Sequence, residues 1–391
     1  MMGGGRELQG GREAMSERLT DVTADRRAYL ESLREQDEGQ HIESHRITLV
    51  AGITRYGSGD VGLSEVVSSL AYSFRTPGLS VRVSGGPLRF SSGDTLSIGG
   101  LSPVRAELDV ALRPTDSLSM GVRAPSSPRT LDPSQVAAIE SIGTSTLDLA
   151  SIEFGTPARL STDLSHAEPL GGSTVLSVNV GAAYEPRPSS DRMSYWRGTT
   201  LRGGVAASGR RGRVRLNARL DVTRSFSDSL GGGNLFQGGG TVLATAGIAS
   251  LAGSGADLLL DVSVFYFRPY AVTRQDVSSR RDPVGDFGGA SALMLWVLGD
   301  VYVAPSVVLS REASNRFVGR DELRGRGWSL APTLAADVSL SRGLTFTPQV
   351  GFATGGVSTE LIAMIAGMIE RFEVSHELSG WWGEAALSWS F

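Results

Sequence analysis

The chain has 391 residues, of which 50 are glycine, none is cysteine and 20% are charged. Disulfides, thiolate metal sites and cysteine nucleophiles are therefore excluded, and no run of about 18 apolar residues is present to form a transmembrane helix. The formal net charge of −4 offers no basic surface for a nucleic-acid partner.

The first segment, residues 1–44, is polar and charge-rich, and its spacing predicts a helix. One set of residues recurs at alternating intervals of three and four positions, which is a short a/d-like seam: Leu19, Val22, Arg26, Tyr29 and Leu33. We interpret this segment as a solvated helical or disordered tail, with a short oligomerisation helix as the alternative. Residues 1–11 contain no apolar core of a signal peptide, so we expect such a signal to lie upstream or to have been removed.

From about residue 45 onward, polar and apolar residues alternate with period two, as in strands with one polar and one apolar face. The clearest case is 213–223, where Arg213, Arg215, Asn217, Arg219, Asp221 and Thr223 alternate with five apolar residues. Many such segments run for about 10–13 residues, whereas ordinary strands average about 5–6. A strand that crosses a membrane at a steep tilt needs about 9–11 residues.

About sixteen strands are predicted on this basis, or fourteen if the segments near 117–125 and 157–168 are not strands. They lie near 45–56, 63–74, 79–90, 101–113, 117–125, 157–168, 173–184, 197–207, 212–224, 240–250, 256–268, 287–297, 300–311, 327–339, 344–354 and 379–391. Short turns follow alternate strands, at 76–78, 114–116, 170–172, 209–212, 253–255, 298–300 and 341–343. Short turns at one end and longer polar loops at the other predict an all-β fold, a transmembrane antiparallel up-and-down β-barrel over residues 45–391.

The last predicted strand ends the chain with an aromatic residue. Trp381, Ala385, Leu387, Trp389 and Phe391 fall on one face of it. This pattern resembles the bacterial outer-membrane β-barrels, and among them the sixteen-stranded porins. In that family such a strand is the signal read by the barrel-assembly machinery, so the resemblance assigns this role to Trp389 and Phe391. It also implies location in the outer membrane, contact with its lipid, a periplasmic place for residues 1–44 and assembly as a homotrimer.

A second resemblance concerns the long segment 126–156, which follows the fifth predicted strand. In porins the corresponding loop folds into the barrel and narrows the pore. Here a short helix is predicted from Asp132 to Ile142, with Asp132 at the N-cap and Pro133 at the first helical position. The acidic candidates of the segment are Asp132, Glu140, Asp148 and Glu153, and the basic candidates on the polar strand faces are Arg82, Arg105, Arg159, Arg202, Arg213, Arg215 and Arg219. An acidic loop that faces a basic wall would create a transverse electric field across the pore. The alternative is that this segment is a surface loop folded over the mouth of the barrel.

Catalytic motifs are weak in this sequence. Residues 57–62 match GxGxxG, but the alternating segment that follows predicts a hairpin loop rather than a dinucleotide-binding fold. Among four histidines, only His376, in the last predicted long loop near Glu373 and Glu377, has catalytic neighbours, and His166 lies near a predicted short turn. We therefore expect no enzymatic activity, no cofactor and no metal site.

The segment 359–372 is unusually apolar for a loop. It could extend the strands, form a helix in the barrel mouth or receive hydrophobic ligands, as in transporters of the long-chain fatty-acid type. The leading prediction is a porin-like channel for passive diffusion of small polar solutes, with that transporter type and a non-conducting structural barrel as alternatives. Aromatic residues predicted for the two membrane interfaces are Tyr72, Phe74, Tyr184, Trp196, Tyr266, Phe267, Trp296, Trp328, Trp381 and Trp389.

Overall fold

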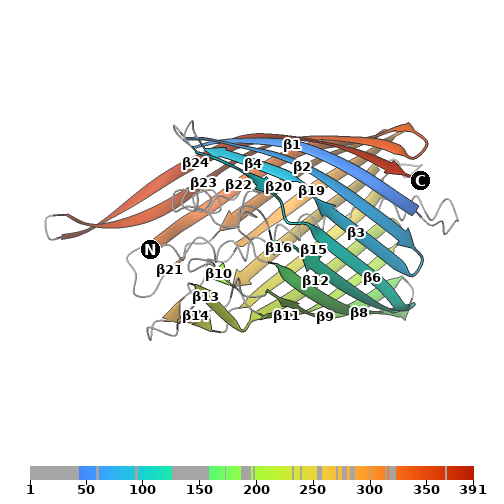
Figure 1. Cartoon of the computed structure of the whole chain (residues 1–391), viewed down its shortest axis with the longest axis horizontal. Helices are drawn as coiled ribbons and strands as arrows, with labels where there is room; N and C mark the ends of the chain where they lie inside the picture. The colour runs from blue at the N-terminus through green and yellow to red at the C-terminus, as the bar shows by residue number, and fades with distance from the viewer. Residues whose placement is uncertain are drawn as a thin grey trace.

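The computed structural model is a closed antiparallel barrel of sixteen strands (Figure 1). It describes residues 44–391 apart from 59–60, 93–95, 126–157, 172, 186–194, 197–198, 231–232, 238–239, 253–257, 270–271, 275–279, 282–286, 300, 313–314, 317–322 and 366–367. All regular secondary structure in this described part is strand. None of the described segments is a helix long and apolar enough to cross a membrane.

The wall is built from strands that follow one another in chain order. They are β1 (Ser44–Ser58), β2 (Val61–Thr76), β3 (Leu79–Gly85), β4 (Pro87–Ser92), β5 (Leu96–Leu101), β6 (Arg105–Arg113), β7 (Asp116–Arg123), β8 (Arg159–Gly171), β9 (Thr174–Tyr184), β11 (Thr199–Arg211), β12 (Val214–Ser225), β15 (Gly240–Ala252), β16 (Leu258–Pro269), β19 (Phe287–Leu298), β20 (Val301–Glu312), β22 (Leu323–Ser341), β23 (Leu344–Ile365) and β24 (Met368–Ser390). The predicted fold class and the count of sixteen are confirmed, because β7 and β8 are both present and paired.

The barrel closes where the first strand meets the last. The register between β1 and β24 runs from Arg46↔Ser390 to Gly57↔Ser379. Two further backbone hydrogen bonds join His45 and Phe391, at N···O distances of 3.1 and 3.0 Å. Every strand edge of the wall therefore has a partner, which is what a β-structure needs in a medium without water.

The third and fourth strands of the wall are each interrupted, which the sequence analysis missed. β2 pairs with β3 over one half of its length and with β4 over the other. Between them lies Gly86, where a Cβ would overlap the backbone of Ser68. The facing strand breaks at 102–104, so the predicted strand 101–113 begins four residues late, at Arg105. Ser102 bridges the break with a backbone hydrogen bond of 2.8 Å to the Gly86 carbonyl.

The tight turns gather at one end of the barrel, here called the turn end, where the C-terminus also lies (Figure 1). Gly212, with φ of 60°, and Gly343, with φ of 82°, supply the left-handed backbone that such turns require. The turn predicted at 209–212 is shifted: β11 continues to Arg211, and Gly212 and Arg213 make the turn. The turn predicted at 253–255 lies outside the described residues.

The opposite end, here called the loop end, carries additional strands. A small five-stranded sheet comprises β10 (Tyr195–Trp196), β13 (Ser227–Leu230), β14 (Gly233–Gln237), β17 (Val272–Arg274) and β18 (Arg280–Arg281), and β21 (Asn315–Arg316) pairs with β22. The segment 359–372 extends β23 and β24 as a paired hairpin up to Ile365↔Met368, so the strand extension is confirmed and the helix is wrong, whereas binding of hydrophobic ligands there stays a prediction. The segment 1–44, for which a helix was predicted, lies outside the described residues except for Ser44 in β1, and so does the segment 126–156.

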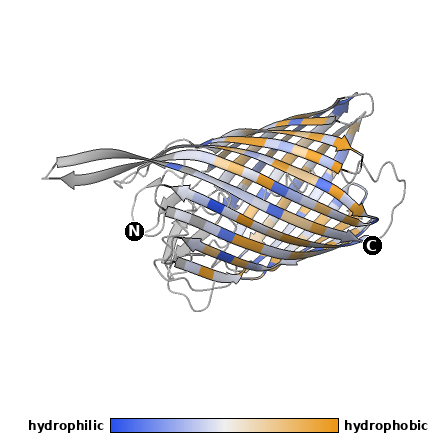
Figure 2. Cartoon of the chain, turned by 90° about the horizontal axis from the view of Figure 1, so that it is seen from above, coloured by the Kyte–Doolittle hydropathy of each residue, from blue (hydrophilic) through white to orange (hydrophobic). Residues whose placement is uncertain are grey.

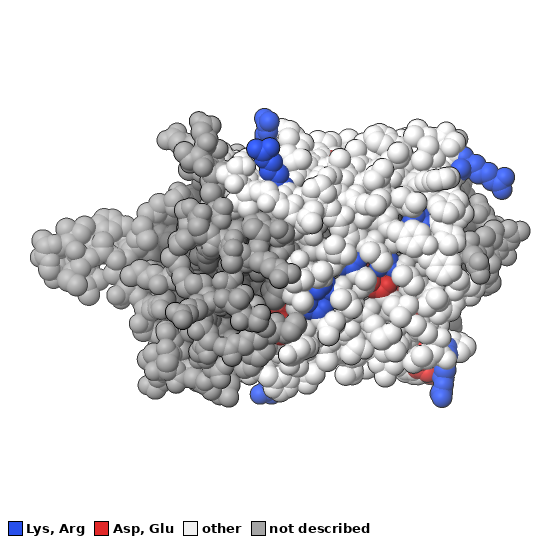
Figure 3. Space-filling view, viewed as in Figure 1, with Lys and Arg blue, Asp and Glu red and all other residues white. Residues whose placement is uncertain are grey.

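Apolar side chains cover the outside of the wall. Along β8, Leu160 and Leu164 are each 51% exposed on the outer face, whereas Arg159, Ser161 and Asp163, which alternate with the outward positions, are half-buried on the inner face. The same alternation of hydrophobic and hydrophilic positions runs along the other strands (Figure 2). On the face seen in Figure 3, most described surface atoms are uncharged, and the arginines that protrude from it lie toward the two ends.

Outward aromatic residues mark both ends of this apolar surface. By strand direction and register, Tyr72, Phe74, Trp296 and Trp389 lie toward the turn end, and Tyr184, Tyr266, Trp328 and Trp381 lie toward the loop end. Phe267 was expected among them, and this is wrong: it is inward-facing and 6% exposed. The inward parity of Phe267 could have been read from Asp261 and Ser263, which share its face of β16; the prediction failed because it used only the position of Phe267 near the end of the strand.

Candidate functional site: the inner wall of the barrel

The inner wall carries most of its charged side chains on one half. This half, from β3 to β12, is here called the arginine wall. Register and alternate burial place Arg82, Arg105, Arg123, Arg159, Arg202, Arg215 and Arg219 on its inward face, with the acids Glu107, Asp109, Asp163, Glu185 and Asp221 among them. The local reason is sequence alternation: on each of these strands the polar residues share one parity and the lipid-facing residues share the other.

Three arginines form a row across neighbouring strands near the loop end. Arg105 pairs with Arg123, and Arg123 pairs with Arg159. Like charges placed directly opposite destabilise a sheet unless something compensates them. Glu185, which follows β9, supplies one compensating charge, since its carboxylate lies 3.4 Å from Nη2 of Arg123.

The pair Arg123–Glu185 is deeply buried. The two side chains are 7% and 8% exposed, and Nε of Arg123 has no hydrogen-bond partner in the described structure. Sequence reasoning missed both residues. Arg123 falls on the same face of β7 as Ser117, Ser119 and Gly121, so the alternation of the sequence could have predicted that it faces inward. Glu185 follows the end of β9, and no alternation there indicates its direction.

A second ion pair spans three neighbouring strands of the arginine wall. Arg202 of β11 and Asp163 of β8 form an ion pair although β9 lies between them. The residue of β9 in that row is Gly181, where a Cβ would overlap the Asp163 carboxylate. Glycine at this position therefore lets the guanidinium reach across an intervening strand.

The third pair lies on a single strand, β12. Arg219 donates from Nε to Oδ2 of Asp221 over 2.7 Å. The Arg219 side chain is 45% exposed, whereas that of Asp221 is 3% exposed, so the cation and not the acid faces the open interior. Gly204 on the neighbouring strand leaves room for this carboxylate, since a Cβ there would overlap it.

A second stretch of the inner wall, from β15 to β24, is here called the apolar wall, and β1 and β2 lie between its β24 edge and the arginine wall. Its described inward charges are the acids Asp261, Asp337 and Glu384. Most other inward positions are apolar or hydroxyl-bearing. Ala249, Leu259 and Leu295 are buried together and pack against Tyr302 and Ala304.

The structure places six of the seven predicted pore-lining arginines on the inner wall. Arg82, Arg105, Arg159, Arg202, Arg215 and Arg219 lie on the inward face, and Arg213 lies in the turn between β11 and β12 rather than on a strand. The acidic candidates Asp132, Glu140, Asp148 and Glu153 lie outside the described residues, as does the side chain of His376. Trp389 and Phe391 face outward at the turn end, 53% and 57% exposed. Their role in assembly, like the role of the arginines in transport, stays a prediction.

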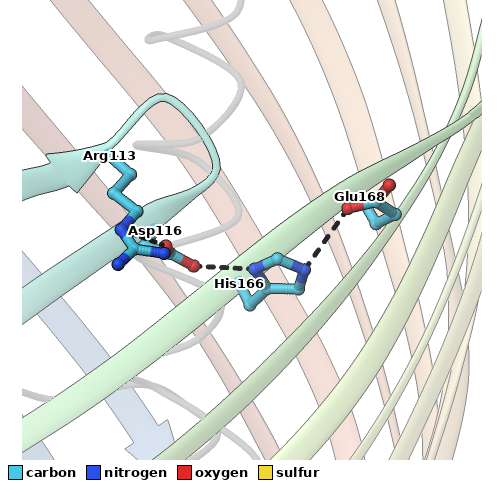
Figure 4. Close-up of polar contacts among 4 residues, drawn as sticks. All are labelled: Arg113, Asp116, His166 and Glu168. Carbon is cyan, nitrogen blue, oxygen red and sulfur yellow. Dashed lines mark hydrogen bonds and ion pairs between the residues drawn. The ribbon is translucent and has the colours of Figure 1, made fainter.

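His166 has a polar environment on the outer rim (Figure 4). Its Nδ1 lies 2.7 Å from Oδ1 of Asp116, and its Nε2 lies 3.5 Å from Oε2 of Glu168. These groups lie at the turn end of the wall: Asp116 is the first residue of β7 after the turn at 114–115, and the backbone N–H of Ala167 donates to the Thr115 carbonyl in that turn. The hydrogen bond with Asp116, together with the Glu168 charge, raises the pKa of His166 above 6.5.

The closed barrel, its apolar exterior and its two aromatic bands together fit one environment. Only a β-structure without free edges can cross a bilayer on strands, and an apolar band flanked by aromatics is the surface that lipid requires. The chain is a β-barrel of the bacterial outer membrane. Short periplasmic turns are the rule in such barrels, so we expect the turn end to face the periplasm and the loop end the exterior.

Comparisons with solved structures find similarity to several outer-membrane proteins and porins. OprB of Pseudomonas putida aligns over 92% of this chain and 96% of its own, with 9% identity and a TM-score of 0.47. OccAB4 of Acinetobacter baumannii aligns over 90% and 99%, with 8% identity and a TM-score of 0.42. The anion-selective porin of Comamonas acidovorans aligns over 90% and 100%, with 11% identity and a TM-score of 0.41. No protein-family model and no curated protein matches the sequence.

Proposed function

We propose that this chain is a channel for the passive diffusion of small polar solutes across the outer membrane. The observation that supports this most is the arginine wall, because inward guanidinium groups such as those of Arg82, Arg202 and Arg219 keep the interior hydrated and would serve no purpose in a dry core. The channel has no catalytic step, and solutes move down their own gradients.

Selection in this proposal combines size exclusion with an electric field. The basic side is the arginine wall, and the acidic side is the segment 126–156 with Asp132, Glu140, Asp148 and Glu153. Arg123 and Arg159 flank that segment in the chain and pair with each other, so the chain leaves the wall and returns to it at the arginine row. A field across a constriction orients dipolar solutes and speeds their passage.

Planar-bilayer recording tests the channel directly. The refolded full chain should give stable, ohmic conductance steps in KCl, and liposomes containing it should swell in small sugars or amino acids. Absence of conductance from protein that shows the heat-dependent gel shift of a folded barrel would overturn the proposal.

A hydrophobic-substrate transporter is the second candidate, because the inner wall is apolar around Leu259, Leu295 and Tyr302. It predicts lipid or fatty acid that co-purifies with the barrel and a closed pore in bilayers. Mass spectrometry of extracted ligand, run on the same preparation as the conductance measurement, separates the two candidates.

We also infer that the barrel assembles as a homotrimer. Single barrels with a wide apolar band can pack side by side in lipid, and such contacts follow point-group symmetry. Native mass spectrometry from detergent should show a species of three times the 41.2 kDa chain mass; a single monomeric species at all detergent concentrations would contradict it.

A further inference from the structure

The arginine wall and the apolar wall meet along a vertical seam at β12, β15 and β16. One row of the register crosses it: Arg219 pairs with Thr245, and Thr245 pairs with Phe265. Opposed residues on neighbouring strands have Cα atoms about 5 Å apart, so Arg219 and Phe265 stand about 10 Å apart on the inner surface. A cation, a hydroxyl and an aromatic ring are thus aligned along one row.

Arg219 presents its charge to the interior at this seam. Asp221 engages Nε, at 2.7 Å, from a position that is itself nearly inaccessible. Guanidinium has five N–H donors in a planar fork, and the remaining ones lie on the end away from Nε. The exposed part of this pair is therefore cationic and suited to an oxyanion, although the pair as a whole is neutral.

Phe265 presents an apolar surface on the other side of the row. The ring is half-buried and lies against Gly289 of β19, where a Cβ would fall 2.6 Å from Cζ of the ring. Phe267, the next inward residue of β16, is buried at 6% exposure and backs the same surface together with Leu243 at 9%. Glycine at 289 thus allows the Phe265 ring to lie along the wall.

We propose that this seam is a binding site for anions with an apolar body, such as aromatic sulfonates or carboxylates. The anionic group meets the exposed end of Arg219, Thr245 offers its hydroxyl midway, and the apolar body lies on Phe265. The Cα atoms of Arg219 and Phe265 are about 10 Å apart, and the Phe265 ring lies over Gly289, on the side of β16 away from Arg219, so the long Arg219 side chain has to carry the anionic group toward the ring. The proposal rests on the proposed function, because the solute reaches the seam only through an open interior.

The test uses four probes that separate charge from apolar character. Benzenesulfonate and isethionate share a sulfonate, and benzyltrimethylammonium and choline share a quaternary ammonium group; in each pair one member has a ring and the other a hydroxyethyl group. Each probe is added to single channels in KCl, and its block of the current is titrated. Benzenesulfonate should block at a concentration about five- to tenfold lower than isethionate, and neither cation should show a ring-dependent difference.

Substitutions then locate the site. In Arg219→Gln and in Phe265→Ser, benzenesulfonate should block the current only at the concentration that isethionate needs. Phe265→Tyr keeps the ring, so in this variant benzenesulfonate should again block at a lower concentration than isethionate. Arg82→Gln, which removes the same charge from the arginine wall away from the seam, should weaken the two sulfonates alike and leave their ratio intact. The heat-dependent gel shift and the KCl conductance of every variant establish that it is folded and open.

The outcomes distinguish the two proposals. Normal conductance with equal block by the two sulfonates overturns the seam site and leaves the channel standing. A ring-dependent difference that persists in Arg219→Gln also overturns it, because the site must then lie elsewhere. Absence of conductance in the unmodified protein overturns the channel and the seam together.

Discussion

At the scale of single residues, the buried pair Arg123–Glu185 is the most consequential contact of the inner wall. Both side chains are more than nine-tenths buried, and Arg123 lies between two further arginines in its row. A buried charge that loses its partner is far more costly than the pair is stabilising, because desolvation is no longer offset.

Glu185→Gln should therefore destabilise the barrel by about 3 kcal/mol in urea unfolding from detergent micelles. Asp109→Asn is the matched control: Asp109 is an exposed inward acid on the same wall, and its loss should cost less than about 1 kcal/mol. Replacing both members of the pair, as Arg123→Met with Glu185→Leu, should recover most of the loss. An unfolding free energy unchanged in Glu185→Gln would show that the ion pair is not formed.

His166 provides a second measurement at the residue scale. Its raised pKa means that the folded chain binds the proton more tightly than an unfolded chain does. The contacts with Asp116 and Glu168 thus stabilise the fold fully below about pH 6.5, and their contribution is lost as the pH rises through the raised pKa.

NMR of labelled histidine in micelles should show His166 titrating above 6.5. Asp116→Asn, which removes the 2.7 Å hydrogen bond, should lower that pKa. Glu168→Gln, which removes the longer 3.5 Å contact, should lower it less. A midpoint at or below 6.5 in the unmodified protein would refute the geometry of Figure 4.

At the scale of elements, the last strand does more than end the chain. The Phe391 ring stacks on His45 at 5.4 Å and contacts Trp389 at 4.9 Å, and its backbone completes the pairing with β1. We expect Phe391 to act as an assembly signal in addition to completing the barrel, and its replacement should then cause two separable defects, one in assembly in cells and one in intrinsic folding.

Phe391→Ser should reduce the folded fraction in the outer membrane by about tenfold or more, as scored by the heat-dependent gel shift, while refolding into micelles falls only slightly. A tenfold loss corresponds to about 1.4 kcal/mol of binding free energy between the last strand and the barrel-assembly machinery. Phe391→Tyr keeps the ring and should assemble normally. Equal losses in cells and in micelles would mean that the residue acts only through the contacts with His45 and Trp389.

The strands themselves were predictable because each repeats its polar and apolar alternation over many residues, and a long period-two pattern has few competing explanations. The breaks at Gly86 and at 102–104 were not, since they arise from the backbone packing of one strand against Ser68. Which residues of β12 face the interior could be predicted from its sequence alone, because every second residue is polar. The partners Arg202–Asp163 and Arg123–Glu185 could not, because they depend on register between strands far apart in the chain.

At the scale of the whole molecule, the inner charges nearly balance, so ion preference depends on where they lie. Arg159 is the first residue of β8 at its loop end, and Arg105 opens β6 directly after the break at 102–104; both lie next to a middle arginine that Glu185 already neutralises. Positive charge in this row attracts anions over a Debye length of about 10 Å in 0.1 M salt and about 3 Å in 1 M salt.

The double substitution Arg105→Gln with Arg159→Gln should therefore shift the zero-current potential in a KCl gradient toward cation preference. The shift should be clear near 0.1 M and nearly absent at 1 M, because screening removes the long-range part of the field. Arg311→Gln removes an exposed arginine from the outward face of β20 and is the matched control, for which no comparable shift is expected. A shift of equal size at both salt concentrations would mean that the arginines act by direct contact with the permeating ion, and an unchanged potential at 0.1 M would remove the arginine row from the selectivity of the channel.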